Sequence, residues 1–253
     1  MKYKGVIAVK CYSKTDIGTV REENQDRINV IELCENTFAA IVCDGMGGEN
    51  AGSEASETAV TVISNIISRG FRKGADENSL RNLLISAVST ANAIVYEKSR
   101  LHEEMRGMGT TCVAAIFCED NAHIVNVGDS RAYFIADGEI SQITIDHTIV
   151  MDMYSKGDIK KEEMKTHPKR NYLTKAIGVS DSVGPDYFEI KGLENTVFLL
   201  CSDGLTGICE DSDILHIINC ASDGDPAEIL VQHAIDVGSR DNISVIVVDC
   251  SGT

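Results

Sequence analysis

Four aspartates stand at the ends of apolar, β-branched runs of the chain, where strands would stop or begin. Asp44 follows FAAIVC, Asp129 follows HIVNVG and Asp203 follows VFLLCS, whereas Asp241 stands shortly before ISVIVVD. In an antiparallel sheet the end of one strand and the start of its neighbour share an edge, so these carboxylates could converge. Like charges repel unless a cation neutralises them, and oxygen ligands favour Mg²⁺ or Mn²⁺ over zinc. The pattern therefore indicates a divalent-metal site.

The same residues also have a simpler interpretation, because Asp-Gly is a common turn signal. We interpret Asp137-Gly138 and Asp223-Gly224 as turns only. The segment DGMGG at 44–48 differs, since it places three glycines between an expected strand and an expected helix. Residues without side chains let the backbone approach a ligand closely, and the start of the helix could help to bind an anion. The chain contains no dinucleotide-binding or P-loop glycine motif and no His-Glu-x-x-His motif.

The apolar periodicity shows which elements would position these residues. Spacings of three and four indicate amphipathic helices from Glu49 to Arg69 and from about Ser79 to Glu104. Shorter helices are expected over Asp211–Ile218 and after Asp225, with Pro226 in the first turn. Long helices together with short hairpin connections favour an α+β fold in which helices cover antiparallel sheet. Short β-branched runs indicate strands at Gly5–Lys10, Asn29–Leu33, Phe38–Cys43, Thr111–Cys118, Ala122–Val127, Arg131–Ala136, Thr196–Cys201 and Ile243–Asp249.

Composition and charge exclude several classes of protein. The 253 residues include 23 Lys and Arg against 39 Asp and Glu, and the net charge of −16 argues against nucleic-acid binding and a polybasic membrane anchor. The longest apolar run, Cys112–Cys118, is far shorter than the roughly 20 residues of a membrane span, and we see no secretory signal. Nine scattered cysteines indicate reduced thiols in a cytoplasmic protein. Without a Pro- or Ser-rich linker, we expect one domain over residues 1–253.

These residues and several further motifs together resemble the metal-dependent Ser/Thr protein phosphatases (the PPM or type 2C family) in their compact bacterial form. The resemblance implies two antiparallel sheets sandwiched between pairs of antiparallel helices. It covers nearly the whole chain through TDIGTVREENQD at 15–26, VCDGMGG at 42–48, AGSEAS at 51–56, GMGTT at 107–111, VGDSRAY at 127–133, ITIDHTIV at 143–150, HPKRNYLTKAIG at 167–178, CSDGLTG at 201–207 and RDNISVIVV at 240–248.

The resemblance implies a metal-binding role for five of these residues. Asp44 would bridge two catalytic ions, and the backbone carbonyl of Gly45 would bind one of them. Asp203 and Asp241 would complete the coordination of the other ion, and Asp129 would bind a third. The expected cofactors are therefore two catalytic Mn²⁺ or Mg²⁺ ions and a third ion.

Two further residues match positions that act on phosphate and water. Arg21 would hold the substrate phosphate, because its planar guanidinium can pair with two phosphate oxygens. Asp26 would orient a metal-bound water. The chain departs from many eukaryotic members at Gln25, where they carry Glu, and at Met46, where they carry a histidine credited as general acid. Methionine cannot donate a proton, so the sequence identifies no general acid.

The implied reaction is hydrolysis of phosphoserine and phosphothreonine monoesters in proteins. A water that bridges two cations loses its proton near neutral pH, and we expect the hydroxide to attack phosphorus directly, without a phosphoenzyme. Cys43 and Cys201 are interpreted as buried strand residues and not as nucleophiles. The expected partners are phosphorylated proteins, including a Ser/Thr kinase of eukaryotic type, and the expected role is in signal transduction. We expect a cytoplasmic monomer that binds neither nucleic acid nor membrane.

Three questions stay open at this point. The polar stretch at about 142–175 resembles the family's flap beside the cleft, where it would tune the choice of protein substrate, but a solvated insertion explains it as well. The chain could also be a pseudophosphatase that binds partners without hydrolysis, although the intact aspartates argue against this. A two-metal hydrolase of nucleotides or other small phosphates is the third possibility, without any recognisable nucleoside site to support it.

Overall fold

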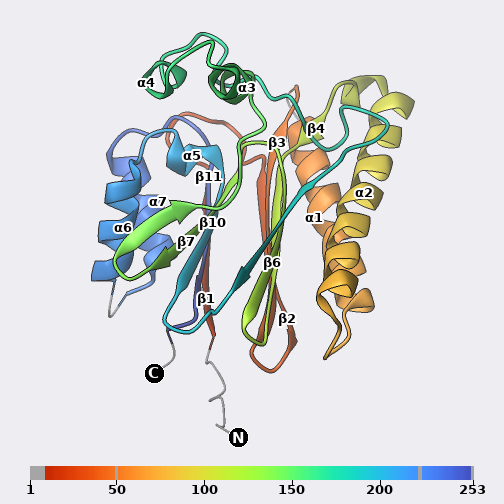
Figure 1. The fold of residues 1–253 in the computed structure, drawn as a ribbon. Coiled ribbons are helices and arrows are strands. Elements are labelled where there is room, and N and C mark those ends of the chain that lie inside the picture. The colour runs from red at the N-terminus through yellow and green to blue at the C-terminus, as the bar shows by residue number, and fades with distance from the viewer. Residues whose placement is uncertain (1–8, 49–50, 222–223, 252–253) are drawn as a thin grey trace, which may run out of the picture.

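Two antiparallel β-sheets lie face to face in the centre of the molecule (Figure 1). The computed structural model describes residues 9–48, 51–221 and 224–251, so most of the expected strand at Gly5–Lys10, and Asp223, lie outside the described residues. The five-stranded sheet consists, in spatial order, of β1 (Lys10–Asp16), β11 (Ile243–Asp249), β10 (Val197–Cys201), β7 (Arg131–Ala136) and β8 (Glu139–Gln142). The six-stranded sheet consists of β2 (Asp26–Cys34), β3 (Thr37–Met46), β5 (Cys112–Cys118), β6 (Asn121–Val127) and β9 (Asp186–Lys191), with β4 (Gly109–Thr110) paired to β3.

Helices cover the outer face of each sheet, which confirms the expected α-β-β-α arrangement (Figure 1). The long helices α1 (Ala51–Gly70) and α2 (Glu77–Leu101) pack on the six-stranded sheet. The shorter α6 (Asp211–Cys220) and α7 (Pro226–Asp236) pack on the five-stranded sheet. As the sequence predicts, Asp225 caps α7 by accepting hydrogen bonds from two backbone N–H groups of its first turn. No helix among the described residues is both long and apolar enough to cross a bilayer.

The core between the two sheets holds them in register. Side chains of β3 and β5 meet side chains of β10 and β11 there, and the rings of Phe117 and Phe198 pack edge to face with centroids 5.0 Å apart. The inner strands β3, β5, β10 and β11 are buried on both faces, which explains their continuous apolar runs. Because these strands are rigidly packed, the loops at their ends have fixed positions.

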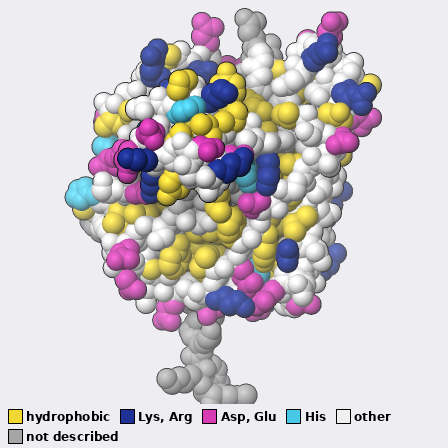
Figure 2. Space-filling model, turned by 45° about the horizontal axis from the view of Figure 1, so that its top comes forward, with side chains coloured by type: hydrophobic (Ala, Val, Ile, Leu, Met, Phe, Trp, Pro, Cys, Tyr) yellow, Lys and Arg dark blue, Asp and Glu magenta, His cyan; other side chains and the backbone are white. Residues whose placement is uncertain are grey.

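A segment between β8 and β9 lies above one end of the sandwich. It contains α3 (Ile149–Lys156) and α4 (Lys161–Met164), seen at the top of Figure 1, within the stretch of about 142–175 that the sequence singles out. Thr148 caps α3, and Gly157 ends it in the left-handed conformation. Here we call residues 149–175 the flap. It carries seven basic and four acidic residues, and Figure 2 shows side chains of both charges mixed on this face.

Apolar periodicity located the inner strands and the edge strand β2, but it did not locate the edge strands β1, β8 and β9. The structure places β1 at Lys10–Asp16, beyond the expected strand at Gly5–Lys10, and adds β8 and β9, which no apolar run in the sequence indicates. These strands lie at the outer edges of the sheets and have polar or only half-buried residues, so they contain no apolar run. The short helix α5 (Asp203–Thr206) was also not expected.

Candidate active site

A cavity of about 1060 Å³ opens at the flap end of the two sheets, and the predicted metal ligands line it. The strands that end or begin here come from both sheets, so residues from distant parts of the chain meet. The predicted site residues among those that line the cavity are Arg21, Asp44, Gly45, Asp129, Asp203 and Asp241. Asp26 lies behind this surface, and the flap contributes residues 171–173 to the wall.

Asp44 and Gly45 are held by backbone contacts near the end of β3. The N–H of Asp44 donates to Thr111 Oγ1 over 2.9 Å, and its carbonyl accepts from the hydroxyl of Thr110 over 2.8 Å. A Cβ atom on Gly45 would lie 2.1 Å from the carbonyl oxygen of Gly52, at the start of α1. Glycine is therefore required where the strand passes beneath the helix.

Asp203 and Asp241 come from adjacent strand ends of the five-stranded sheet. Asp203 begins α5 directly after β10, and Asp241 precedes β11. The backbones touch here, since a Cβ atom on Gly204 would lie 1.9 Å from the carbonyl oxygen of Asn242. Asn242 also donates through Nδ2 to the carbonyls of Ile17 and Glu23, both over 3.0 Å. Asn242 could not be singled out from the sequence, because a buried amide that joins loops has no signal in periodicity.

Asp129 occupies the tight turn between β6 and β7. Gly128 has φ +103°, and a Cβ atom there would lie 2.6 Å from the side chain of Thr111, so the turn requires glycine. The hydroxyls of Ser130 and Thr111 share a hydrogen bond of 2.7 Å. Thr111 thus contacts both the Asp129 turn and the backbone of Asp44, although the sequence analysis assigned it no role.

Arg21 pairs with one of the predicted metal ligands. Its Nη2 lies 2.7 Å from Asp241 Oδ2, and about half of the arginine side chain is exposed to solvent. The sequence predicts separate roles for these two residues, one toward phosphate and one toward metal. The structure places the guanidinium at the carboxylate, so phosphate and ion would bind in direct proximity.

Asp26 is buried and has one oxygen without a partner. Its Oδ2 accepts a hydrogen bond of 2.7 Å from Ser202, whereas no described group pairs with the buried Oδ1. Burial raises the pKa of Asp26 to about 7, against the effect of its hydrogen bonds. In the β2–β3 register Asp26 lies opposite Asp44, so it stands directly behind the cavity floor.

The cavity concentrates negative charge. Six acidic residues and one basic residue, Arg21, are among the described residues that line it. Burial, followed by the proximity of neighbouring carboxylates, raises the pKa of Asp44 well above its usual range. The same causes raise the pKa of Asp203, and of Asp129 to about 7. These groups would be stabilised by a cation.

The donor set suits hard divalent cations, because carboxylate and carbonyl oxygens predominate and no histidine or cysteine is among the described lining residues. No three His, Cys, Asp or Glu side chains within the described ranges already form a group that could hold an ion. The case for a metal site therefore rests on the oxygen ligands and on the acids that lie near one another, not on a complete set of ligands already in place. Met46 lines the cavity and Cys43 and Cys201 are fully buried, as the sequence predicts for these cysteines.

The sequence profile of the family described as Protein phosphatase 2C matches residues 19–220. The serine/threonine phosphatase stp of Listeria monocytogenes is 34% identical over 237 residues, which are 93% of this chain and 94% of that protein. The structure of the Streptococcus agalactiae serine/threonine phosphatase has a TM-score of 0.89 and 32% identity over 95% of this chain and 99% of that one.

One similar structure contains metal. The catalytic domain of the serine/threonine protein phosphatase PstP, in complex with two manganese ions, has a TM-score of 0.81 and 28% identity. The match covers 95% of this chain and 97% of that one. The similarity in sequence and in structure thus extends over nearly the full length of the chain.

Proposed function

This chain belongs to the protein phosphatase 2C family, and on that premise we propose that it hydrolyses phosphoserine and phosphothreonine monoesters in proteins with the help of divalent metal ions. The observation that carries the proposal is the cavity in which Asp44, Asp129, Asp203 and Asp241 meet. Their sequence positions span nearly 200 residues, yet they line one surface beside an arginine. Acids gathered in this way are suited to metal-assisted phosphoryl transfer.

The floor of the cavity would hold the ions. Asp44, Asp203, Asp241 and the carbonyl of Gly45 would bind the two catalytic Mn²⁺ or Mg²⁺ ions, and Asp129 would contribute to a third. Bound divalent ions neutralise phosphate charge and lower the pKa of water, which makes hydroxide available near neutral pH. Asp26, beneath the floor, would orient the attacking water through its unpaired oxygen.

Arg21 would bind the phosphate at the mouth of the cavity. Its guanidinium is half exposed and already lies beside Asp241, so it can reach a phosphate that approaches the floor. The attacking water forms a new P–O bond as the bond from phosphorus to the serine or threonine oxygen breaks. The proton that the attacking water gives up balances the proton that the leaving oxygen takes up, and inorganic phosphate is released.

Transfer of the phosphoryl group directly to water agrees with the composition of the cavity. No cysteine or serine is found among the described residues that line it. The hydroxyl of Thr111 is buried and engaged by Asp44 and Ser130, so it is a poor nucleophile. We therefore propose a mechanism without a phosphoenzyme.

The flap would tune the choice of protein substrate. Its residues 171–173 line the cavity, and Tyr172 is 59% exposed, so a protein that presents its phosphate would contact the flap. We further propose that a Ser/Thr kinase of eukaryotic type is among the partners, because reversing its phosphorylation is the role that such an activity serves in signal transduction. The enzyme is proposed to act as a cytoplasmic monomer.

Phosphate release from a phosphothreonine peptide tests the proposal. The assay compares Mn²⁺, Mg²⁺ and a chelator for the wild type, Asp203→Ala and the control Asp236→Ala, which alters an exposed residue of α7. We expect metal-dependent release that only Asp203→Ala abolishes. No release by folded wild type with either metal would favour a pseudophosphatase. Faster turnover of nucleotides than of phosphopeptides would favour a small-phosphate hydrolase.

A further inference from the structure

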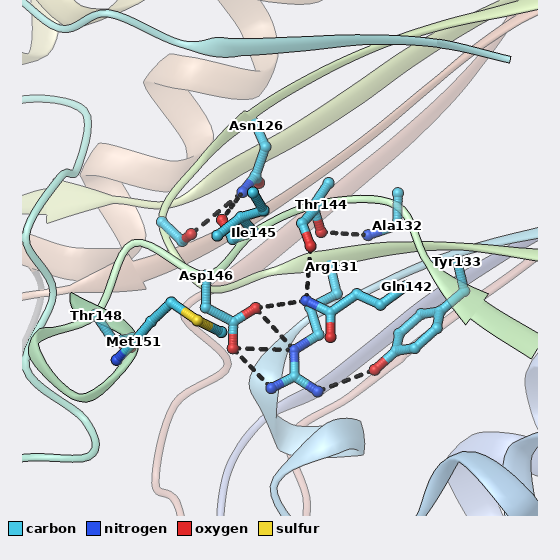
Figure 3. Close-up of polar contacts among 11 residues, drawn as sticks. Asn126, Arg131, Ala132, Tyr133, Gln142, Thr144, Ile145, Asp146, Thr148 and Met151 are labelled. Atoms are coloured by element: carbon cyan, nitrogen blue, oxygen red, sulfur yellow. Dashed lines mark hydrogen bonds and ion pairs between the residues drawn. The ribbon is translucent and has the colours of Figure 1, made fainter. Parts of the chain in front are cut away.

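Asp146 and His147 form the root of the flap, between β8 and α3. Asp146 is buried and accepts hydrogen bonds from Arg131 at the start of β7, 2.9 Å from Nε and 2.7 Å from Nη2 (Figure 3). Gln142 donates to the same carboxylate over 2.8 Å. Arg131 is two residues from Asp129, so this ion pair fixes one side of the Asp129 turn to the flap.

His147 holds the other side of that turn. Its ring is buried, and Nδ1 accepts the backbone N–H of Gly128 over 3.0 Å. Its own backbone N–H donates to the carbonyl of Gly128 over 2.9 Å. The buried Asn126 adds a bond of 3.2 Å from Nδ2 to the same carbonyl (Figure 3). The residue before Asp129 is thus bound on both its N–H and its carbonyl.

The outer nitrogen of the His147 ring contacts a different group. Because Nδ1 accepts a hydrogen bond, the proton of the neutral ring lies on Nε2, 3.2 Å from Asp186 Oδ2 at the start of β9. Burial lowers the pKa of His147, which favours this neutral form. Lys175 Nζ lies 2.9 Å from the other oxygen of Asp186 and 3.2 Å from Nε2 itself, so both residues lie on the Nε2 side of the ring. The two ring nitrogens therefore have separable partners.

The backbone of His147 also joins the two ends of the flap. Its carbonyl accepts a hydrogen bond from the N–H of Thr174 over 2.8 Å. Two residues further along the chain, the N–H of Ile149 donates to the carbonyl of Tyr172 over 2.9 Å. Tyr172 and Leu173 line the cavity. One residue consequently connects the turn that carries Asp129 with the part of the flap that faces the substrate.

We propose that His147 is a positioning residue for Asp129: its Nδ1 fixes the Gly128–Asp129 turn so that the Asp129 carboxylate can help to hold an ion, and its backbone ties the flap to that turn. The inference rests on the proposed function, in which Asp129 binds the third ion. Loss of the Nδ1 acceptor would leave the Gly128 N–H unpaired and let the turn move. Ion binding at Asp129 would weaken, whereas binding at Asp44, Asp203 and Asp241 would persist.

Two amide variants separate the roles of the ring nitrogens. In His147→Asn the side-chain oxygen takes the place of Nδ1 and can accept from Gly128. In His147→Gln the amide lies near the place of Nε2, where it can reach Asp186 but not Gly128. Asp186→Asn is the matched control, because it changes the partner of Nε2 and leaves Nδ1 untouched. Asp129→Ala identifies the ion whose binding depends on that carboxylate.

The measurement is Mn²⁺ binding to the full chain by calorimetry, with thermal unfolding to show that each variant is folded. We expect His147→Gln to raise the Kd of the Asp129-dependent ion about tenfold, as the loss of one buried hydrogen bond would. His147→Asn and Asp186→Asn should stay within about threefold of the wild type.

Three results would overturn the inference. Wild-type Mn²⁺ binding in both His147 variants would show that the Nδ1 bond is dispensable. Equal weakening in both, or weakening in His147→Asn alone, would show that the ring is a packing element or acts through Asp186. If Mn²⁺ binding does not change in Asp129→Ala, then no ion depends on Asp129 and the inference fails. None of these results affects the hydrolysis assay, so failure of the inference and failure of the proposed function are distinguishable.

Discussion

Two neighbouring groups of aspartates in this molecule have surroundings of opposite charge. On the cavity floor, Asp44 and Asp203 face other acids, and burial and mutual repulsion raise their pKa values. At the flap root, Asp146 and Asp186 face basic partners, Arg131 and Lys175. For Asp186 the bonds from Lys175 and His147 outweigh burial, which acts in the other direction, and its pKa is lowered. Asp44 and Asp203 would be neutralised by a cation from solution, whereas Asp146 and Asp186 already face a cationic side chain of the protein.

The acids of the cavity floor would serve the reaction and lower the stability of the metal-free protein. The acids at the flap root, with their basic partners, would help to maintain the fold. Removing a floor acid should relieve repulsion in the metal-free protein and abolish activity. Removing Arg131, the partner of Asp146, should leave a buried charge unpaired and destabilise the fold.

The largest effect is expected for Asp44→Asn. An amide cannot bridge two cations as a carboxylate does, so we expect kcat/KM toward a phosphopeptide to fall at least about 10³-fold, equivalent to about 4 kcal/mol. The same variant should unfold at a higher temperature than the wild type in chelator, because one of the repelling charges is gone. Activity near the wild-type level, or a lower Tm in chelator, would place Asp44 outside the repelling floor group.

Next in size is the effect of Arg131→Met on stability. The substitution leaves the carboxylate of Asp146 buried without its ionic partner, and we expect a loss of about 3 kcal/mol in the free energy of unfolding, measured with urea. The double variant Arg131→Met/Asp146→Leu should recover most of this loss, since no charge is then left unpaired. A single variant as stable as the wild type would show that this ion pair does not maintain the fold.

Metal ions should stabilise the protein by binding to the acids of the cavity floor and not elsewhere. At an Mn²⁺ concentration 100 times the Kd, binding adds about 2.7 kcal/mol to the free energy of unfolding. We expect this gain in the wild type, and a much smaller gain in Asp44→Asn, with unfolding by urea as the measurement. A gain of equal size in both proteins would mean that the ions bind elsewhere.

The smallest effects concern pH, and they should have opposite signs for the two groups. Asp129 has a folded-state pKa of about 7, above its unfolded value, so in chelator its destabilising contribution grows as the pH rises from about 4 to 7. Asp129→Asn should therefore gain stability over the wild type across that range.

Asp186 has a lowered pKa, so its stabilising contribution is present above about pH 4 and is lost as the pH falls through its folded-state value. Asp186→Asn should be less stable than the wild type at pH 7, and the difference should shrink as the pH falls below about 4. Urea unfolding of both variants and the wild type along a pH series provides the measurement. Differences of the same sign for the two variants would remove the contrast between floor and root.

The sequence predicted the inner architecture well for a physical reason. Strands buried on both faces have long apolar runs, and the expected strands at Arg131–Ala136 and Ile243–Asp249 coincide with β7 and β11. Helices with one buried face show spacings of three and four, as in α1 and α2. The edge strands β8 and β9 have partly exposed residues without such a pattern, so periodicity could not locate them.

By itself the sequence determined which residues can do chemistry here and that they stand at the ends of the expected strands. This follows because strand ends, glycine turns and acid side chains are local features. Only the tertiary structure decided which groups face each other: that Arg21 meets Asp241, that Asn242 joins two loops, and that His147 holds the turn of Asp129. Those contacts join residues up to 225 positions apart, and their geometry exists only after the two sheets have packed.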